Sequence, residues 1–597
     1  MSERKVTFGR IFWPSLWAAL IVSVLGVIVW LIVIGSVIGS LEGDTGLKVE
    51  DHTVLHMTLN GEIQEMSASE FDPMNFKMNH SPGLVDILHG LEIAKTDKKI
   101  EGLFIELEGV SCGFSTAQDI RNAIKDFEKS GKFVVAYHSG EYVSQLEYYI
   151  ASAATKNYGF PTTNMQMLGL GAELSYFKGT LDMLDVEMQV IRGSNNDFKS
   201  AVEPFFRENM SDSSRLQIET YINGLWDNYK KEIAADRKIS VEELDRIAEN
   251  VLVTDLKDAV KYKLIDETKY RDEVLALLSD QAGTKKGDEL ELLPFMKYAK
   301  KRFYQDQILL KEDAPNVAVI IAEGDVSRDG DGLSSEEICK LFREVREDKN
   351  IKTVVFRINS PGGSALASDE IWREVKLTND KKKVVVSMGD VAASGGYYIA
   401  APASAIFAQP TTITGSIGVF GVIPYTGAML ENKLGITFDR VFTNQHSVMT
   451  TNRRLTEEET AIIQKSVDDI YDDFKSRVAE GRGMTKEQVD VIARGRVWTG
   501  QDAKRIGLVD ELGGLTDAIA YAADKAGIKN PTVLYYPNVK EDPFEELLEQ
   551  LSEAENTKIR SQHTELPKAL VEYYESLKSL EAISGIQMRL PYRVSIR

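Results

Sequence analysis

The sequence is poor in cysteine and has no excess of basic residues. Only two cysteines, Cys112 and Cys339, occur among 597 residues; they lie far apart and without ligand-like spacing, which argues against a zinc site. The formal net charge of −21 argues against a nucleic-acid partner, because phosphates are bound by lysine and arginine in excess. We predict no nucleic acid, no metal and no cofactor.

The N-terminal run 11–41 lacks Asp, Glu, Lys, Arg, His, Asn and Gln altogether. About 20 apolar residues span a bilayer, so this run is long enough for a transmembrane helix. Arg4, Lys5 and Arg10 precede it, and the positive-inside rule predicts that residues 1–10 stay cytoplasmic while the bulk is exported. A cleaved signal peptide is the alternative, but its apolar core would be about 7–15 residues. We predict an uncleaved anchor in the lipid bilayer.

The chain contains a long internal duplication. Residues 132–174 align without gaps to a second segment 249 positions later, so that Tyr148 falls on Tyr397 and Pro161 on Pro410. A repeat of this length indicates two related domains. Short β-branched runs such as TVVFRI alternate with helical stretches in each half, which predicts parallel βαβ units and an α/β fold.

These patterns divide the chain into six predicted segments. They are a cytoplasmic N-terminus 1–10, a membrane anchor 11–41, an N-terminal repeat 47–275, a connector 276–312, a C-terminal repeat 313–535 and a helical tail 536–597 with no assigned function.

The two copies differ where a chemical function would be expected. In DVAASGGYYIA (390–400) Ser394 stands before two glycines just after a predicted strand, whereas the aligned position in the first copy is Gln145. The loop NSPGGS (359–364) aligns with EGVSCG, which lacks Pro-Gly-Gly. A purely structural corner would look alike in both copies, so the asymmetry predicts one active site with Ser394 as its nucleophile.

The glycine-rich loop offers what an acyl-transfer site needs beside the nucleophile. Gly362 and Gly363 let a bare backbone approach a substrate. Their amides, with that of Gly395, are predicted to hold the oxyanion of a tetrahedral intermediate. An ordinary glycine turn is the alternative for this loop taken alone.

A serine hydroxyl also needs a base to accept its proton. No histidine lies near the glycine-rich motifs of the second half, and His446 is the other candidate there. A Ser-Lys pair is a recognised variant, which requires a lysine whose pKa is lowered by burial. The residues alone leave this choice open.

The motifs TVVFRINSPGGS, VVVSMGDVAASGGYYIA and TTITGSIGVFG closely resemble the signal peptide peptidase A (protease IV) family. The anchor, the tandem halves and the length match its long, duplicated form. The resemblance implies two tandem Clp protease/crotonase-like domains, each a layered ββα superhelix, after one N-terminal transmembrane helix. It also implies a homo-oligomeric ring, a tetramer by analogy with the family.

The resemblance further implies the roles of two residues. Lys199, in DFKSAVEPF of the N-terminal repeat, matches the family's base, and Ser416, in TGSIG, matches a serine that orients this lysine. The base is missing from the second half, where Lys199 aligns near Met449. Each half would then contribute one member of a Ser394–Lys199 dyad.

The predicted function is a membrane-anchored serine endopeptidase. It would degrade signal-peptide remnants and other extended apolar peptides from the outer, periplasmic side of the cytoplasmic (inner) membrane. Two alternatives are kept: an acyl-CoA enzyme of the crotonase type, and a non-catalytic membrane-anchored scaffold. Labelling by a serine-reactive inhibitor would separate them.

Overall fold

The computed structural model of the protein describes residues 49–72, 77–284, 290–312, 315–328, 332–537 and 585–589. The chain separates into two compact units, and the larger comprises Glu50–Glu70, His80–Lys540 and Ser561–Arg597. The smaller unit, Met1–Val49 with Phe71–Asn79 and Glu541–Arg560, contains few described residues. All predicted site residues belong to the larger unit.

The predicted anchor, 11–41, and the predicted cytoplasmic segment, 1–10, lie outside the described residues. Within the described ranges, no helix combines the length and the apolar character needed to cross a membrane. The anchor stays a prediction from the sequence.

The first half contains two groups of elements. The elements up to the first sheet's edge are β1 (Thr53–Glu62), β2 (Ala68–Asp72), β3 (Lys77–Ser81), α2 (Leu84–Thr96), β4 (Ile100–Ser111), α3 (Phe114–Glu128), β5 (Phe133–His138), β6 (Tyr142–Val143), α4 (Gln145–Ala151), β7 (Lys156–Gly159) and β8 (Asn164–Met165). They are followed by α5 (Lys178–Met183), β9 (Glu187–Arg192), the 3-10 helix η1 (Ser200–Phe205), α6 (Asp212–Arg237), α7 (Val241–Glu249), α8 (Leu256–Lys261), β10 (Glu267–Thr268), α9 (Arg271–Ala282), β11 (Leu292–Pro294) and α10 (Phe295–Glu312).

The second half repeats this alternation. Its elements are β12 (Val317–Glu323), β13 (Val326–Ser327), β14 (Leu333–Ser334), α11 (Ser335–Glu347), β15 (Thr353–Ser360), β16 (Gly362–Ser364), α12 (Ala365–Lys381), β17 (Val384–Ala393), α13 (Gly395–Ala400), β18 (Ala405–Ala408), β19 (Ile413–Gly415), β20 (Phe420–Tyr425), α14 (Gly427–Leu434), α15 (Glu457–Arg482), α16 (Lys486–Ile492), β21 (Val497–Thr499), α17 (Gly500–Arg505), β22 (Glu511–Leu512), α18 (Leu515–Lys525), β23 (Val533–Tyr536) and, far along the chain, β24 (Gly585–Arg589).

The two large sheets share one plan. The first has the order β10-β7-β5-β4-β1-β11, and the second contains the series β22-β18-β17-β15-β12-β23. Every neighbouring pair in both series is parallel. The central strand β15 is buried on both faces, which is why TVVFRI reads as a continuous apolar run. The mixed α/β architecture is confirmed, and each strand of one series has a counterpart at the same place in the other series.

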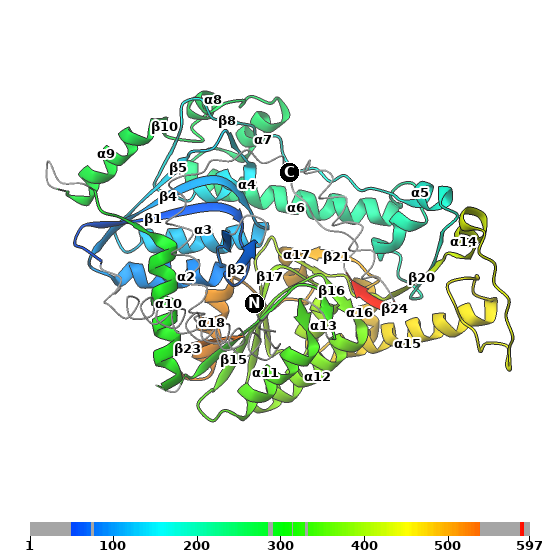
Figure 1. The fold of residues 1–597 in the computed structure, drawn as a ribbon. Coiled ribbons are helices and arrows are strands. Elements are labelled where there is room, and N and C mark those ends of the chain that lie inside the picture. The colour runs from blue at the N-terminus through cyan, green and yellow to red at the C-terminus, as the bar shows by residue number, and fades with distance from the viewer. Residues whose placement is uncertain are drawn as a thin grey trace, which may run out of the picture. The chain divides into compact units, whose positions relative to one another are not determined.

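A third sheet joins elements that are far apart in the sequence. Its order is β14-β13-β16-β24-β20-β9, and Figure 1 shows β24, in red, beside β16 and β20. Strand β9, from the first half, pairs antiparallel with β20, with Arg192 opposite Phe420. This pairing leads the chain that follows β9 toward the second half.

A buried charged cluster links the two halves. Arg357, on β15, is fully buried, and its guanidinium pairs with Glu65 at 2.9 Å and with Asp119 of α3 at 3.1 Å. Burial acts to lower the pKa of Arg357, but the Glu65 and Asp119 carboxylates raise it. Burial also raises the pKa of Asp119 to about 6 and that of Glu323 to about 7. The cluster therefore contains more carboxyl groups than its single arginine can neutralise.

The segment predicted as a connector, 276–312, contributes to the fold. Its strand β11 pairs with β1, and the side chains of Phe295 and Tyr298 at the start of α10 are buried. The many polar residues of this segment suggested a connector, so the short apolar stretch LLPF within it was not recognised as part of the fold. The predicted domain boundaries stay predictions.

We expect Arg357→Met to destabilise the protein strongly. The change leaves the Glu65 and Asp119 carboxylates buried without their cation, which typically costs about 3–5 kcal/mol. The stability of the variant should rise as the pH falls from 8 toward 5. Carboxyl groups with raised pKa values bind protons more tightly in the folded state than in the unfolded state, so acid favours folding. Urea unfolding over this pH range measures both effects.

Arg343→Met is the matched control. Arg343 is largely exposed and lies 3.5 Å from Glu374, and exposed ion pairs contribute about 0–1 kcal/mol. Equal stability losses in the two variants would contradict a linking role for Arg357.

Candidate active site

Ser394 lies on a sharp turn between β17 and α13. Its backbone has φ 55° and ψ −114°, values typical of the first central position of a type II′ turn, which favours glycine. The amide of Ser394 donates a hydrogen bond to the carbonyl of Gly415 at 2.8 Å. A non-glycine residue in this conformation is strained, and such strain is found preferentially at functional sites.

The glycines after Ser394 are required by close packing against the loop 359–364. A Cβ on Gly396 would lie 2.5 Å from the carbonyl oxygen of Ser360, and a Cβ on Gly395 would lie 3.1 Å from the amide nitrogen of Gly363. Both distances are shorter than ordinary contacts. The two glycine-rich motifs are therefore packed directly against each other.

Lys199 comes from the first half and reaches this turn. Its Nζ atom lies 2.8 Å from Ser394 Oγ, 3.0 Å from Ser416 Oγ and 3.1 Å from the Ser416 carbonyl oxygen. Lys199 immediately precedes η1, in the chain that β9 leads toward β20. The structure thus brings together three predicted residues. Lys199 is 195 positions from Ser394 and 217 positions from Ser416.

The environment of Lys199 is dry. Lys199, Ser394 and Ser416 are all fully buried. Burial lowers the pKa of Lys199 well below its ordinary value, because the ammonium form loses its hydration. The three hydrogen-bond partners of Nζ are a carbonyl and two hydroxyl oxygens, and none is a carboxylate that would restore the charge. A neutral amine next to a serine hydroxyl can accept its proton.

The backbone around Lys199 is held by a loop of the second half. Phe198 donates its amide hydrogen to the Arg494 carbonyl at 3.0 Å, and Gly495 donates to the Ile417 carbonyl at 2.8 Å. Gly495 has φ +78°, and a Cβ there would lie 2.5 Å from the Cβ of Lys199. Sequence reasoning did not identify Gly495, because nothing in ARGRVW indicates a neighbour from the first half.

The predicted oxyanion donors differ in their surroundings. The amide of Gly362 donates to Ser360 Oγ at 3.2 Å, so it is engaged within its own loop. Gly362 has φ +100°, and a Cβ on it would lie 2.6 Å from the amide nitrogen of Gly395. Gly363 pairs with Val326 of β13. The Gly395 amide, next to the nucleophile, is the donor whose position best fits this role.

Two other residues of the sequence analysis lie elsewhere. His446 faces Glu459, with 3.4 Å between Nδ1 and Oε1. Gln145, in the place of Ser394, begins helix α4, and its side chain binds the backbone of Leu168 and Gly169 at 2.8–3.0 Å. At the position where the second half has its serine, the first half thus has a glutamine whose side chain is hydrogen-bonded to the backbone.

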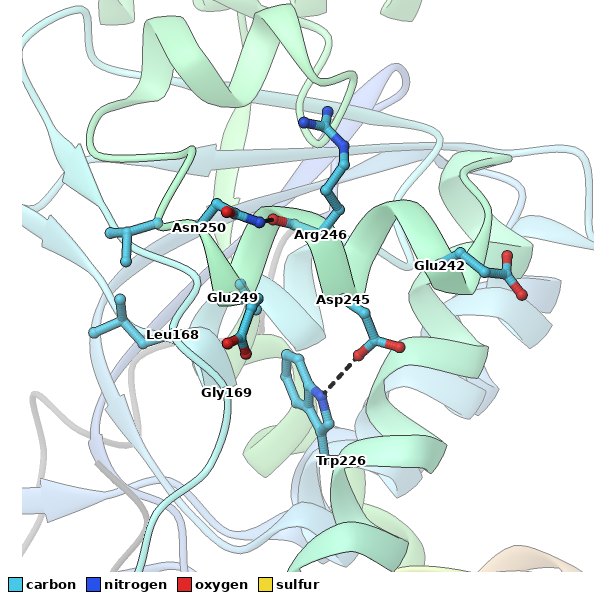
Figure 2. Close-up of a pocket in the computed structure, with 10 residues that line it drawn as sticks. Leu168, Gly169, Trp226, Glu242, Asp245, Arg246, Glu249 and Asn250 are labelled. Atoms are coloured by element: carbon cyan, nitrogen blue, oxygen red, sulfur yellow. Dashed lines mark hydrogen bonds between the residues drawn. The ribbon is translucent and has the colours of Figure 1, made fainter.

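A cavity of about 740 Å³ lies next to Leu168 and Gly169, the residues that the Gln145 side chain contacts (Figure 2). It lies between Leu168, Gly169, Trp226 and helix α7, and the Trp226 indole donates to Asp245 at 3.3 Å. Its lining contains acidic and apolar side chains, Arg246 and Asn250, and among the described residues that line it there is no serine, cysteine or lysine. It is therefore distinct from the candidate active site.

We expect Gly495→Ala to disturb the position of Lys199. A methyl group there collides with the Lys199 backbone, so the variant should lose stability and react at least tenfold more slowly with a fluorophosphonate probe at Ser394. Gly483→Ala is the control, because Gly483 has φ +63° with nothing within 4 Å of its Cβ position. It should show only the backbone cost of about 1–2 kcal/mol. Equal labelling of Ser394 in both variants would contradict this role of Gly495.

Comparisons with known proteins place the chain in a family. The sequence model of Peptidase family S49 matches residues 126–285 and 376–529. The chain is 32% identical to "Serine protease SPPA, chloroplastic" of Arabidopsis thaliana, over 81% of this chain and 70% of the relative. It is 36% identical to "Protease 4" of Salmonella typhi, over 76% of this chain and 74% of the relative.

A solved structure of a ClpP1 mutant from Listeria monocytogenes matches 35% of this chain and 98% of that chain at 19% identity, with a TM-score of 0.24. That score is too low to support a conclusion, so the predicted Clp protease/crotonase-like fold stays a prediction. The family match and the two long relatives carry the identification. The chain belongs to peptidase family S49, and it is a serine peptidase.

Proposed function

We propose that Ser394 and Lys199 form the catalytic dyad of this serine peptidase. The observation that carries the proposal is the 2.8 Å contact between Lys199 Nζ and Ser394 Oγ inside a single chain. Burial supports it, because it lowers the pKa of Lys199 well below its ordinary value and so favours the neutral amine that can act as a base.

The proposed reaction has two stages. In the first, Ser394 Oγ attacks a peptide carbonyl carbon while Lys199 Nζ takes the hydroxyl proton. The Gly395 amide stabilises the oxyanion, and Lys199 then returns the proton to the leaving amine as an acyl-enzyme ester forms. In the second, Lys199 accepts a proton from water as the water oxygen attacks the ester carbon; the bond to Ser394 Oγ breaks, and Lys199 returns the proton to Oγ as the carboxylate product leaves. Ser416 positions Lys199 through its hydroxyl and carbonyl oxygens.

The proposed substrates are extended apolar peptides, including signal-peptide remnants. The predicted anchor 11–41 would hold the peptidase on the outer face of the cytoplasmic membrane, where such remnants lie. A homo-oligomer of Clp protease/crotonase-like subunits, a tetramer by family resemblance, remains part of the proposal. Membership of a peptidase family favours this function over an acyl-CoA enzyme or a scaffold.

We expect Ser394→Ala and Lys199→Arg to abolish hydrolysis of casein and to prevent fluorophosphonate labelling at position 394. Alanine lacks the nucleophile, and a guanidinium stays charged near neutral pH. Ser394→Ala should leave the melting temperature nearly unchanged, because alanine keeps the Cβ and removes one small group. Full activity in either variant would refute the dyad.

The activity should rise with pH through the lowered pKa of Lys199. Below that pKa the ammonium cannot accept the serine proton, and above it the neutral amine can, so the rate climbs to a plateau. The measurement is kcat/KM for an apolar ester peptide from pH 5 to 10. Ser416→Ala should keep this shape but lower the plateau several-fold, because it removes a hydrogen bond of about 0.5–1.5 kcal/mol. A pH-independent rate in the parent protein would exclude a titrating base.

A further inference from the structure

Lys199 is the central residue of a tight turn. Its backbone has φ −77° and ψ 75°, and the Ser200 amide donates a hydrogen bond to the Phe198 carbonyl at 2.8 Å. These backbone angles and this bond define an inverse γ-turn. Helix η1 begins directly after it, and the Lys199 side chain does not cap that helix. A three-residue turn fixes a side chain weakly by itself, so contacts from outside the turn decide where the amine lies.

The side chain of Gln217 spans this turn. Gln217 lies on α6 and is fully buried. Its amide nitrogen donates hydrogen bonds to the Phe198 carbonyl at 3.0 Å and to Ser200 Oγ at 2.9 Å. Both protons of that nitrogen are therefore used, one on each side of Lys199. The residues before and after the base are held by one side chain.

The amide oxygen of Gln217 bonds to the second half. Gln217 Oε1 accepts a hydrogen bond from the Val497 amide at 3.2 Å. Val497, on β21, lies opposite Gly415 of β19, and the Gly415 carbonyl accepts the amide hydrogen of Ser394 at 2.8 Å. A single glutamine thus connects the turn that carries the base to the strand pair that holds the nucleophile.

We propose that Gln217 is a positioning residue of the dyad, which keeps Lys199 Nζ within reach of Ser394 Oγ by bracing the turn around Lys199 against β21. The inference rests on the proposed function of the Ser394–Lys199 pair. Gln217 acts through the segment 198–200 and takes no part in the proton transfer itself. Without the brace the amine would shift relative to the hydroxyl, and a small displacement of reacting groups lowers a rate strongly.

A neutral amide is the group that suits this place. Glutamate would have the same length and could accept the Val497 hydrogen, but it would bring a negative charge into the buried surroundings of a lysine. A carboxylate close to an ammonium group favours the charged form, in which Lys199 cannot accept a proton. Glutamine supplies the hydrogen bonds without this effect.

Gln307→Leu is the matched control for Gln217→Leu. Gln307 is a buried glutamine of α10. Its amide donates to the Val533 carbonyl and accepts from the Tyr535 amide, each at 2.9 Å. Both of these partners belong to β23, which contributes no residue to the candidate active site. The two leucine variants thus lose the same kind of buried side-chain bonds, and only one of them loses the brace.

Steady-state kinetics of the full chain, purified in detergent, test the proposal with the apolar ester peptide as substrate. Melting temperatures are measured in parallel, and both leucine variants should melt at a lower temperature than the parent. Only Gln217→Leu should also lower kcat, by roughly tenfold or more, while its KM stays within about twofold of the parental value. Equal kcat values in the two leucine variants would overturn the positioning role and leave the proposed function intact.

A second substitution keeps the test decisive if Gln217→Leu does not fold. Gln217→Glu is nearly isosteric, but a carboxyl group has at most one proton to donate, so at least one bond beside Lys199 is lost. We expect its kcat to fall by about fivefold or more, and a folded Gln217→Glu protein with the parental kcat would refute the brace. A parent chain that does not hydrolyse the ester in a Ser394-dependent manner would instead contradict the proposed function.

Discussion

The burial of a lysine is the constraint on which this structure depends. Lys199 can act on Ser394 only if its amine can lose its charge, and it is fully buried, with serine oxygens as the partners of Nζ among the described residues. Exclusion of water requires protein on all sides, which one half does not supply. The turn 393–396, the segment around Ser416 and the loop at Gly495 come from the second half, while the lysine comes from the first.

The halves are held together by interactions of two different kinds. Strands β9 and β20 pair through their backbones, which fixes the direction in which the chain approaches the site. Arg357, Glu65 and Asp119 form a buried ionic contact, which depends on charge balance and is therefore sensitive to pH. The lysine thus lies at an interface that is held by main-chain pairing and by a separate buried ionic cluster.

Local patterns in the sequence predicted part of this site, and the reasons for the rest are physical. Glycines that pack against each other must be glycines, so the turn at Ser394 and the loop 359–364 could be recognised without a structure. Lys199 differs in no local way from the other basic residues, and only the family resemblance indicated it. Its burial, and the role of Gly495, arise from contacts between distant segments. The duplication predicted the parallel strands, but a five-residue strand in a polar tail gave no periodic signal.

The position of β24 within the third sheet has a consequence for the two strands that flank it. In the order β14-β13-β16-β24-β20-β9, the tail strand is, among the described strands, the single link between the two pieces of the sheet. Without β24, the described strands of this sheet would form two separate pieces, β14-β13-β16 and β20-β9. The strand that joins the two pieces pairs through its backbone groups, so the joining depends little on its side chains.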